Sequence, residues 1–125
     1  MIKLSKSVNL AVEDGVAVIT IDSPPVNALN EGVRTGLMAG FQQVCEDDDI
    51  KAAVLICDGR TFIVGADISD FGGPYDSPTH HEILDLMDQC PKPIVAAMHG
   101  TALGGGLETA LVCHYRIADK DTRLG

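Results

Sequence analysis

Three short apolar runs, separated by segments with helical periodicity, constrain the fold of this 125-residue chain more than any other feature. They are Val16–Ile21, Ala53–Cys57 and Ile94–Met98, and each is nearly continuous. Such runs are typical of strands that are covered on both faces. Strands that alternate with helices imply crossover connections between parallel neighbours. The sequence therefore predicts an α/β fold with a largely parallel sheet.

The segments around these runs carry their own start and stop signals. Further strands are expected at Val8–Val12, which an Asp14-Gly15 turn joins to the next run, and at His114–Ala118. One helix should begin after Asn30, a good N-cap. A second helix should end before Pro91–Pro93, and a third should open within Gly104–Gly106 and run through Cys113.

Composition excludes several classes of function. Eighteen acidic residues against nine basic ones give a net charge of -9, so nucleic acid is not an expected partner. No apolar run approaches the length of a membrane span, and residues 1–15 lack the apolar stretch of a signal peptide. We expect a protein of the bacterial cytoplasm or an organelle matrix that is not secreted.

The cysteines and histidines give no sign of a metal site. The four cysteines form no CxxC pair and are expected to be reduced. His80 and His81 are expected at the surface without a metal.

The richest segment for chemistry is Gly100–Glu108, where a strand gives way to a glycine-rich turn and then to a helix. This arrangement exposes backbone N–H groups at a helix N-terminus, where negative charge is stabilised. The dinucleotide pattern fails because position 109 is Thr, and the Lys-Ser/Thr of a phosphate loop is absent. An N–H donor site for another kind of anion remains.

Glu108, just past that turn, has two interpretations that the residues alone leave open. A first-turn carboxylate can simply complement the helix dipole. Alternatively, its apolar neighbours Leu107 and Leu111 predict partial burial, which would raise the pKa of this carboxyl and suit a general acid or base.

A second turn, Gly65-Ala66-Asp67, follows the strand that ends near Cys57. It is either an ordinary loop with Asp67 as a helix cap or a second source of accessible N–H groups. Two such turns at neighbouring strand ends could aim two donors at one oxygen, an effect worth about 3–4 kcal/mol per donor in stabilising an oxyanion.

Three segments, Pro25–Leu29, Gly65–Ile68 and Gly100–Glu108, closely resemble the signature regions of the enoyl-CoA hydratase/isomerase (crotonase) superfamily. The resemblance covers essentially the whole chain. Ala102–Glu108 followed by Cys113–Ala118 is most similar to the N-terminal hydratase part of multifunctional fatty-acid oxidation enzymes, in which a 3-hydroxyacyl-CoA dehydrogenase follows. The implied fold is a repeated ββα spiral, with residues 1–125 as the N-terminal part of one domain that is incomplete at its C-terminus.

The resemblance also implies roles for individual residues. The backbone N–H groups of Ala66 and Gly105 would form an oxyanion hole for the thioester carbonyl, and Glu108 would be one of two catalytic glutamates. The residues implied to bind the acyl-CoA substrate are Val26, Ala28, Gly65, Ala66, Asp67, Ile68, Ser69, Gly104 and Gly105. The implied reaction is syn addition of water to a trans-2-enoyl-CoA thioester in fatty-acid β-oxidation, with no metal and no cofactor other than the coenzyme A of the substrate.

Departures from the family pattern leave alternatives open. The second glutamate lies in a Gly-x-Pro-Glu segment of the family, whereas this chain ends at Gly125, and Thr109 replaces a common Leu. The chain is therefore expected to be a truncated fragment of a longer enzyme. Two alternatives to hydratase activity remain. One is Δ3–Δ2 enoyl-CoA isomerase activity or a related enolate chemistry, and the other is a non-catalytic acyl-CoA-binding or assembly fragment. The expected assembly is a trimer-type homo-oligomer or a multifunctional complex.

Overall fold

The computed structural model describes residues 1–65 and 78–125. In chain order its elements are β1 (Ile2–Ser5), β2 (Val8–Glu13), β3 (Val16–Ile21), α1 (Glu31–Glu46), β4 (Ala52–Cys57), α2 (His80–Gln89), β5 (Ile94–Met98), β6 (Thr101–Ala102), α3 (Gly105–Val112), β7 (Tyr115–Ala118) and β8 (Arg123–Leu124). The strands and helices expected from the apolar pattern are all present, with bounds that agree to within one or two residues. The short strands β1, β6 and β8 were not predicted.

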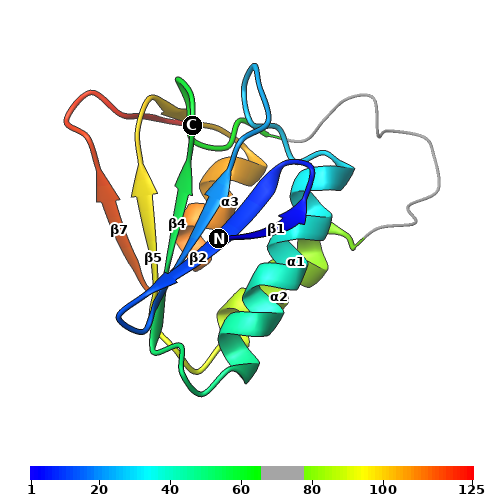
Figure 1. The fold of residues 1–125 in the computed structure, drawn as a ribbon. Helices are drawn as coiled ribbons and strands as arrows, with labels where there is room; N and C mark the ends of the chain where they lie inside the picture. The colour runs from blue at the N-terminus through cyan, green and yellow to red at the C-terminus, as the bar shows by residue number, and fades with distance from the viewer. Residues whose placement is uncertain (66–77) are drawn as a thin grey trace.

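The larger sheet has six strands in the order β1-β2-β3-β4-β5-β7 (Figure 1). Strands β3, β4, β5 and β7 are parallel neighbours, and β1, β2 and β3 pair in antiparallel fashion. The α/β prediction with a largely parallel sheet is thus confirmed. Strands β6 and β8 form a separate parallel pair. At the predicted hairpin turn, Asp14 and Gly15 both have positive φ, the conformation that a two-residue turn between twisted strands requires.

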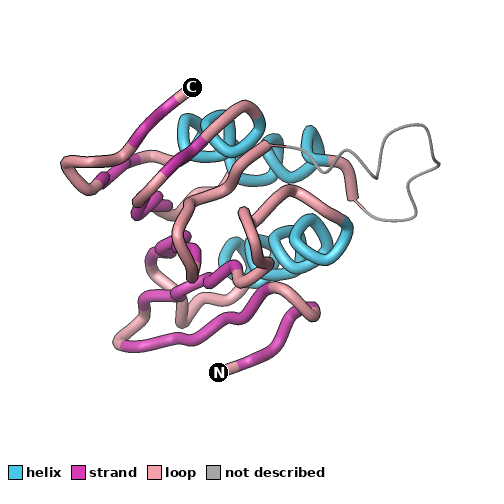
Figure 2. The backbone as a smooth tube through the Cα atoms, turned by 90° about the horizontal axis from the view of Figure 1, so that it is seen from above, coloured by secondary structure: helices cyan, strands magenta, loops and turns pink. Residues whose placement is uncertain are grey.

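The three described helices lie on one side of the larger sheet, as Figures 1 and 2 show from two directions. Alternate strand residues point toward them and are buried, among them Ile19 of β3 and Leu55 of β4, which pack with Leu37 and Phe41 of α1 in one core. Every second residue of β3, β4 and β5 on the other face is only half-buried. Covering on both faces was therefore a wrong expectation for the described residues, because no described helix packs against the outer face.

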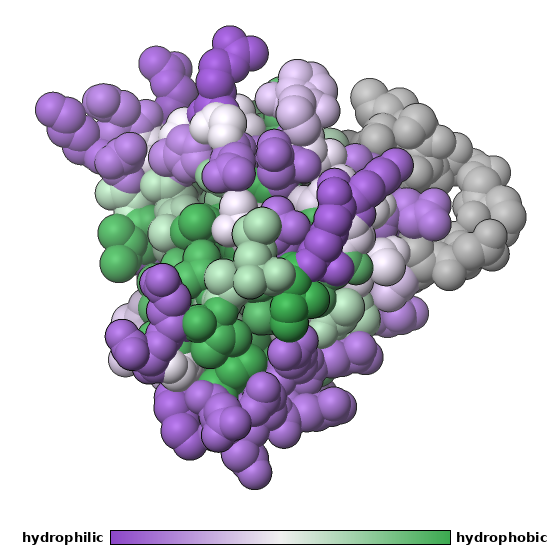
Figure 3. Space-filling model, viewed as in Figure 1, coloured by the Kyte–Doolittle hydropathy of each residue, from purple (hydrophilic) through white to green (hydrophobic). Residues whose placement is uncertain are grey.

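Apolar side chains gather on that outer face (Figure 3). The edge strand β7 is exposed along its whole length, and Tyr115 and Ile117 each leave 66% of their surface accessible. None of the helices in residues 1–65 and 78–125 is long and apolar enough to cross a membrane.

Helix α1 packs closely on the sheet because glycines line its inner face. A Cβ atom on Gly36 would lie 2.4 Å from the Cβ of Val8, so only glycine fits this contact. The helix begins as predicted, with Oδ1 of Asn30 accepting a hydrogen bond of 2.9 Å from the Val33 N–H.

The four cysteines are free, as expected. Desolvation by burial is the main reason why the pKa values of the Cys45 and Cys113 thiols rise to about 12. Burial also raises the pKa of Cys57. These three thiols therefore stay protonated at neutral pH and are poor nucleophiles.

Candidate active site

Gly65, the described residue of the second glycine turn, lies beside the first glycine turn. Val64 and Leu103 form a parallel β-bridge, and the Gly65 N–H donates a hydrogen bond of 2.9 Å to the Leu103 carbonyl. The Leu103 N–H in turn donates to the carbonyl of Ile63 at 3.3 Å. The backbone just before Ala66 is therefore held against the backbone just before Gly105.

At the start of α3, hydrogen bonds occupy the N–H groups on both sides of Gly105. Gly104 donates to the carbonyl of Gly125 at 2.8 Å, and Gly106 donates to that of Leu103 at 2.9 Å. Within the described part of the chain, the Gly105 N–H has no hydrogen-bond acceptor. This N–H lies at the positive end of the helix, where it could donate to a ligand.

Two glycines fix the approach of these turns because backbone atoms occupy the space of a side chain. A Cβ on Gly106 would lie 1.8 Å from the Ile63 carbonyl oxygen, and a Cβ on Gly100 would lie 2.1 Å from the Arg60 carbonyl oxygen. Gly100 also has a φ of +65°, which side chains disfavour. The start of helix α3 and the turn before it thus lie directly against the backbone between Arg60 and Ile63.

Replacing Gly106 with Ala should destabilise the protein strongly, because α3 would have to move away from Ile63. Overpacking costs about 1–3 kcal/mol, and we expect the upper end here because the clashing atom is backbone. Chemical denaturation would measure the loss. Gly59→Ala is the control, since a Cβ there meets nothing within 4 Å and only the positive φ opposes it. Equal stability of Gly106→Ala and wild type would contradict this account.

Glu108 lies in the first turn of α3 and is exposed. The predicted partial burial is wrong, because α3 buries the face that carries Gly106, Thr109 and Ala110 and leaves the apolar Leu111 59% exposed on the other. The Glu108 carboxylate is open to a ligand, and its charge acts on the ring of His80, where it raises the pKa against the effect of burial.

Hydrogen bonds hold the turn that contains Val26 and Ala28 against the segment that runs from Asp58 to Gly65. Asn27, only 3% exposed, donates from Nδ2 to the carbonyls of Asp58 and Thr61 at 2.9 Å each, and its Oδ1 accepts from the Ser23 N–H at 2.8 Å. The Leu29 N–H donates to the carbonyl of Gly65 at 2.9 Å. Hydrogen bonds thus join the Val26–Leu29 turn to Gly65. The Leu29 side chain also lies next to Gly105, where Cδ1 would be 2.8 Å from a Cβ atom.

Two further residues complete this region: Arg34, which the sequence analysis did not single out, and His80, which it expected at the surface. Arg34, 4% exposed, donates from Nη1 to the Leu29 carbonyl at 2.6 Å and from Nε to the Pro78 carbonyl at 3.0 Å, so it links the Val26–Leu29 turn to the start of α2. Its place on the apolar face of α1, next to Val33, was the available signal. His80 is half-buried against α3, which corrects the surface prediction, whereas His81 is exposed as expected.

Four of the predicted binding residues, Ala66, Asp67, Ile68 and Ser69, lie outside the described residues. Within the described ranges, no cluster of His, Cys, Asp and Glu could hold a metal ion.

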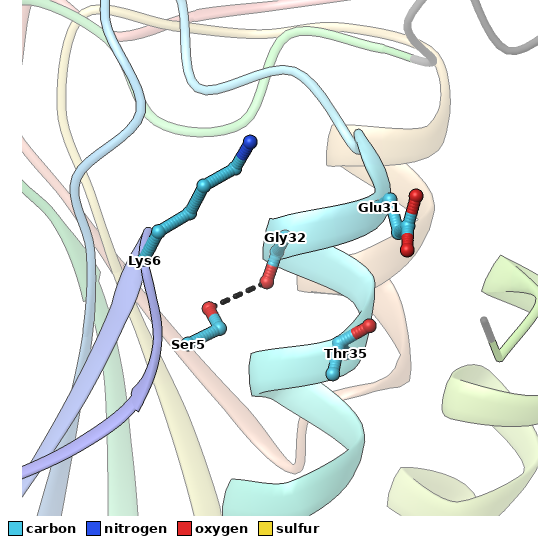
Figure 4. A pocket seen from close by; sticks show the side chains of 5 residues that line it. All are labelled: Ser5, Lys6, Glu31, Gly32 and Thr35. Atoms are coloured by element: carbon cyan, nitrogen blue, oxygen red, sulfur yellow. Dashed lines mark hydrogen bonds between the residues drawn. The ribbon is translucent and has the colours of Figure 1, made fainter.

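A pocket of about 370 Å³ opens at the first turn of α1 (Figure 4). It is lined by Ser5, Lys6, Glu31, Gly32 and Thr35, and Ser5 Oγ donates to the Gly32 carbonyl at 2.6 Å. None of the predicted site residues that the structure describes lines this pocket.

The repeated passage from sheet to helix, with the turns before Ala66 and Gly105 brought together, defines an α/β spiral of the crotonase type. Residues 11–125 match the model of the enoyl-CoA hydratase/isomerase family. The chain therefore belongs to the enoyl-CoA hydratase/isomerase family.

Individual relatives agree with this placement. The chain is 45% identical to a peroxisomal bifunctional enzyme of Danio rerio, over 91% of this chain and 16% of the relative. It is 41% identical to a probable enoyl-CoA hydratase of Bacillus subtilis, over 95% of this chain and 49% of the relative. A solved enoyl-CoA hydratase/isomerase of Pseudoalteromonas atlantica superposes with a TM-score of 0.87 at 33% identity, over 95% of this chain and 48% of that one. The chain thus spans about half, or less, of the length of these relatives.

Proposed function

We propose that the protein carrying this chain is an enoyl-CoA hydratase, which adds water to trans-2-enoyl-CoA thioesters. The observation that carries the proposal is the Gly105 N–H, which has no acceptor among residues 1–65 and 78–125. It lies one helical turn before the accessible carboxylate of Glu108 and beside the segment that ends at Gly65. Such a donor stabilises negative charge on an oxygen, and such a carboxylate can transfer a proton.

In the proposed reaction, the oxygen of water bonds to C3 of the enoyl group and a proton is added to C2 on the same face. The electrons of the C2–C3 double bond move toward the thioester carbonyl, whose oxygen carries the charge of the enolate. The N–H groups of Gly105 and Ala66 donate to that oxygen, and Glu108 is one of the groups that move the protons of water. No metal or redox cofactor takes part, and coenzyme A enters only with the substrate.

Glu108 favours hydration over isomerisation of the double bond. Water must lose a proton as it adds, and a carboxylate at the start of α3 supplies a group for this transfer. Enoyl-CoA isomerisation and other enolate chemistry remain the second candidate within the family, because they use the same stabilised oxygen.

The names of the relatives are the basis for proposing the pathway, the compartment and the assembly of the protein. One is named a peroxisomal bifunctional enzyme, others are named multifunctional proteins of peroxisomal or glyoxysomal fatty-acid β-oxidation, and one is a probable enoyl-CoA hydratase of a bacterium. We propose a role in β-oxidation in an organelle matrix or bacterial cytoplasm. In this proposal the chain is the N-terminal part of a longer hydratase, as a trimer-type oligomer or part of a multifunctional enzyme.

The test compares trans-2-enoyl and 3-enoyl thioesters as substrates of the protein as its own cell makes it. Hydration is followed by loss of the ultraviolet absorbance of the conjugated thioester, and products are separated by chromatography. Formation of the 3-hydroxyacyl thioester supports the proposal. Conversion of the 3-enoyl thioester without hydration would favour the isomerase. Binding of a saturated acyl-CoA by calorimetry, without any turnover, would leave only a binding role.

A further inference from the structure

His80, Thr109 and Gly105 form a chain of polar contacts that runs from α2 to the start of α3. The Thr109 hydroxyl lies 2.7 Å from the Gly105 carbonyl oxygen, and Nε2 of His80 lies 2.9 Å from the same hydroxyl. Thr109 is completely buried, so water cannot replace either partner.

The direction of these hydrogen bonds follows from the number of protons. A carbonyl oxygen only accepts, so the single hydroxyl proton of Thr109 is donated to Gly105. The hydroxyl therefore offers a lone pair to His80, and the Nε2 atom of the ring must carry a proton. This requirement fixes the tautomer of the neutral ring, with the proton on Nε2 and none on Nδ1.

The ring also lies against Gly105 itself. A Cβ atom built on Gly105 would lie 3.2 Å from Cε1 of His80 and 3.4 Å from its Nδ1. Burial is the main influence on the ring and lowers the pKa of His80, while the negative charge of Glu108 on α3 opposes this effect. His81 on α2 and Arg34 on α1 also lower the pKa, so the neutral ring is favoured at pH 7.

We propose that His80 is a positioning residue, which acts through Thr109 to hold Gly105 so that its N–H meets the thioester oxygen. The proposal rests on the proposed function. His80 touches no reacting atom in this account. It fixes the residue that donates to the enolate, and a donor displaced by a fraction of an ångström loses much of its effect in the transition state.

The experiment compares His80→Leu with His80→Gln, whose amide nitrogen can donate to Thr109 as Nε2 does. We expect His80→Leu to lower kcat for trans-2-enoyl thioester hydration about 10- to 100-fold, with KM nearly unchanged, because the lost effect belongs to the transition state. His80→Gln should recover most of this loss. His81→Leu, an exposed neighbour on the same helix, is the matched control and should keep wild-type kinetics.

Thr109→Val tests whether the contacts act as one unit. It removes the hydroxyl with little change of shape, so its loss should match that of His80→Leu. The double variant should then be no worse than either single variant, because both break the same link. Additive losses, or His80→Leu kinetics equal to wild type, would overturn the proposal.

Hydrogen exchange tests the positioning role of His80 independently of the proposed function. In the protein without substrate, His80→Leu should increase amide exchange in the segment Gly104–Thr109, and His80→Gln should not. Unchanged exchange in His80→Leu would overturn the positioning role whatever the activity. Wild-type protein that hydrates no enoyl thioester would refute the proposed function, while the exchange comparison would still decide whether His80 holds Gly105.

Discussion

Changing Glu108 to Gln should reduce hydration of a trans-2-enoyl thioester by about 10³-fold, since an amide cannot exchange a proton as a carboxylate does. Thioester binding should persist, because the substitution leaves the Gly105 N–H and the Val26–Leu29 turn in place. Glu108 is exposed, so the fold should tolerate the change, with a loss of about 0.5 kcal/mol from the helix dipole interaction. Steady-state kinetics and calorimetry with a saturated acyl-CoA would measure the two effects.

Glu82→Gln is the matched control, because Glu82 is also an exposed carboxylate in the first turn of a helix, here α2. A role limited to the helix dipole predicts the same small effect in both variants. Catalysis predicts a large loss at position 108 alone. Near wild-type turnover of Glu108→Gln would reject the catalytic assignment.

The second large effect is expected at Gly105, where Pro would remove the N–H itself. Loss of one oxyanion donor costs about 10²–10³ in kcat. Position 105 is the first residue of α3, where proline is tolerated because the N–H makes no bond within the helix. The loss should therefore appear in kcat more than in stability, and chemical denaturation would verify this.

Gly105→Ala separates loss of the donor from added bulk. This variant keeps the N–H, and its Cβ would meet Cδ1 of Leu29 at 2.8 Å, where the end of a side chain can move. We expect a loss of kcat several times smaller than that of Gly105→Pro. A shift of the thioester carbonyl stretch in infrared spectra of the bound substrate should be weaker with Pro than with Ala. Equal kcat losses in the two variants would mean that crowding, not the missing donor, causes the defect.

The sequence predicted those parts of the fold that depend on local pattern. Asn30 caps α1, Asp14 and Gly15 turn the first hairpin, and the glycines at 104–106 begin α3, because each follows from backbone geometry at one place in the chain. The meeting of the Gly65 and Gly104 turns also followed, since the strands that precede them are parallel neighbours.

Long-range packing was less predictable. The environment of His80 depends on Thr109, which lies 29 residues away along the chain. The exposure of Glu108 depends on which face of α3 meets the core, and the apolar residues around it, exemplified by the exposed Leu111, pointed to the wrong face. The half-exposed outer face of the sheet depends on where the helices lie, which a continuous apolar run does not specify.

The close backbone approaches at Gly100 and Gly106 bear on how far related sequences can diverge while keeping this turn. The donor that we assign to Gly105 belongs to the main chain, so changes of surrounding side chains cannot delete it. What cannot change is the absence of a side chain at positions 100 and 106, where any Cβ would displace the turn. A few such fixed points explain how a solved relative that shares only 33% of its aligned residues with this chain still superposes with a TM-score of 0.87.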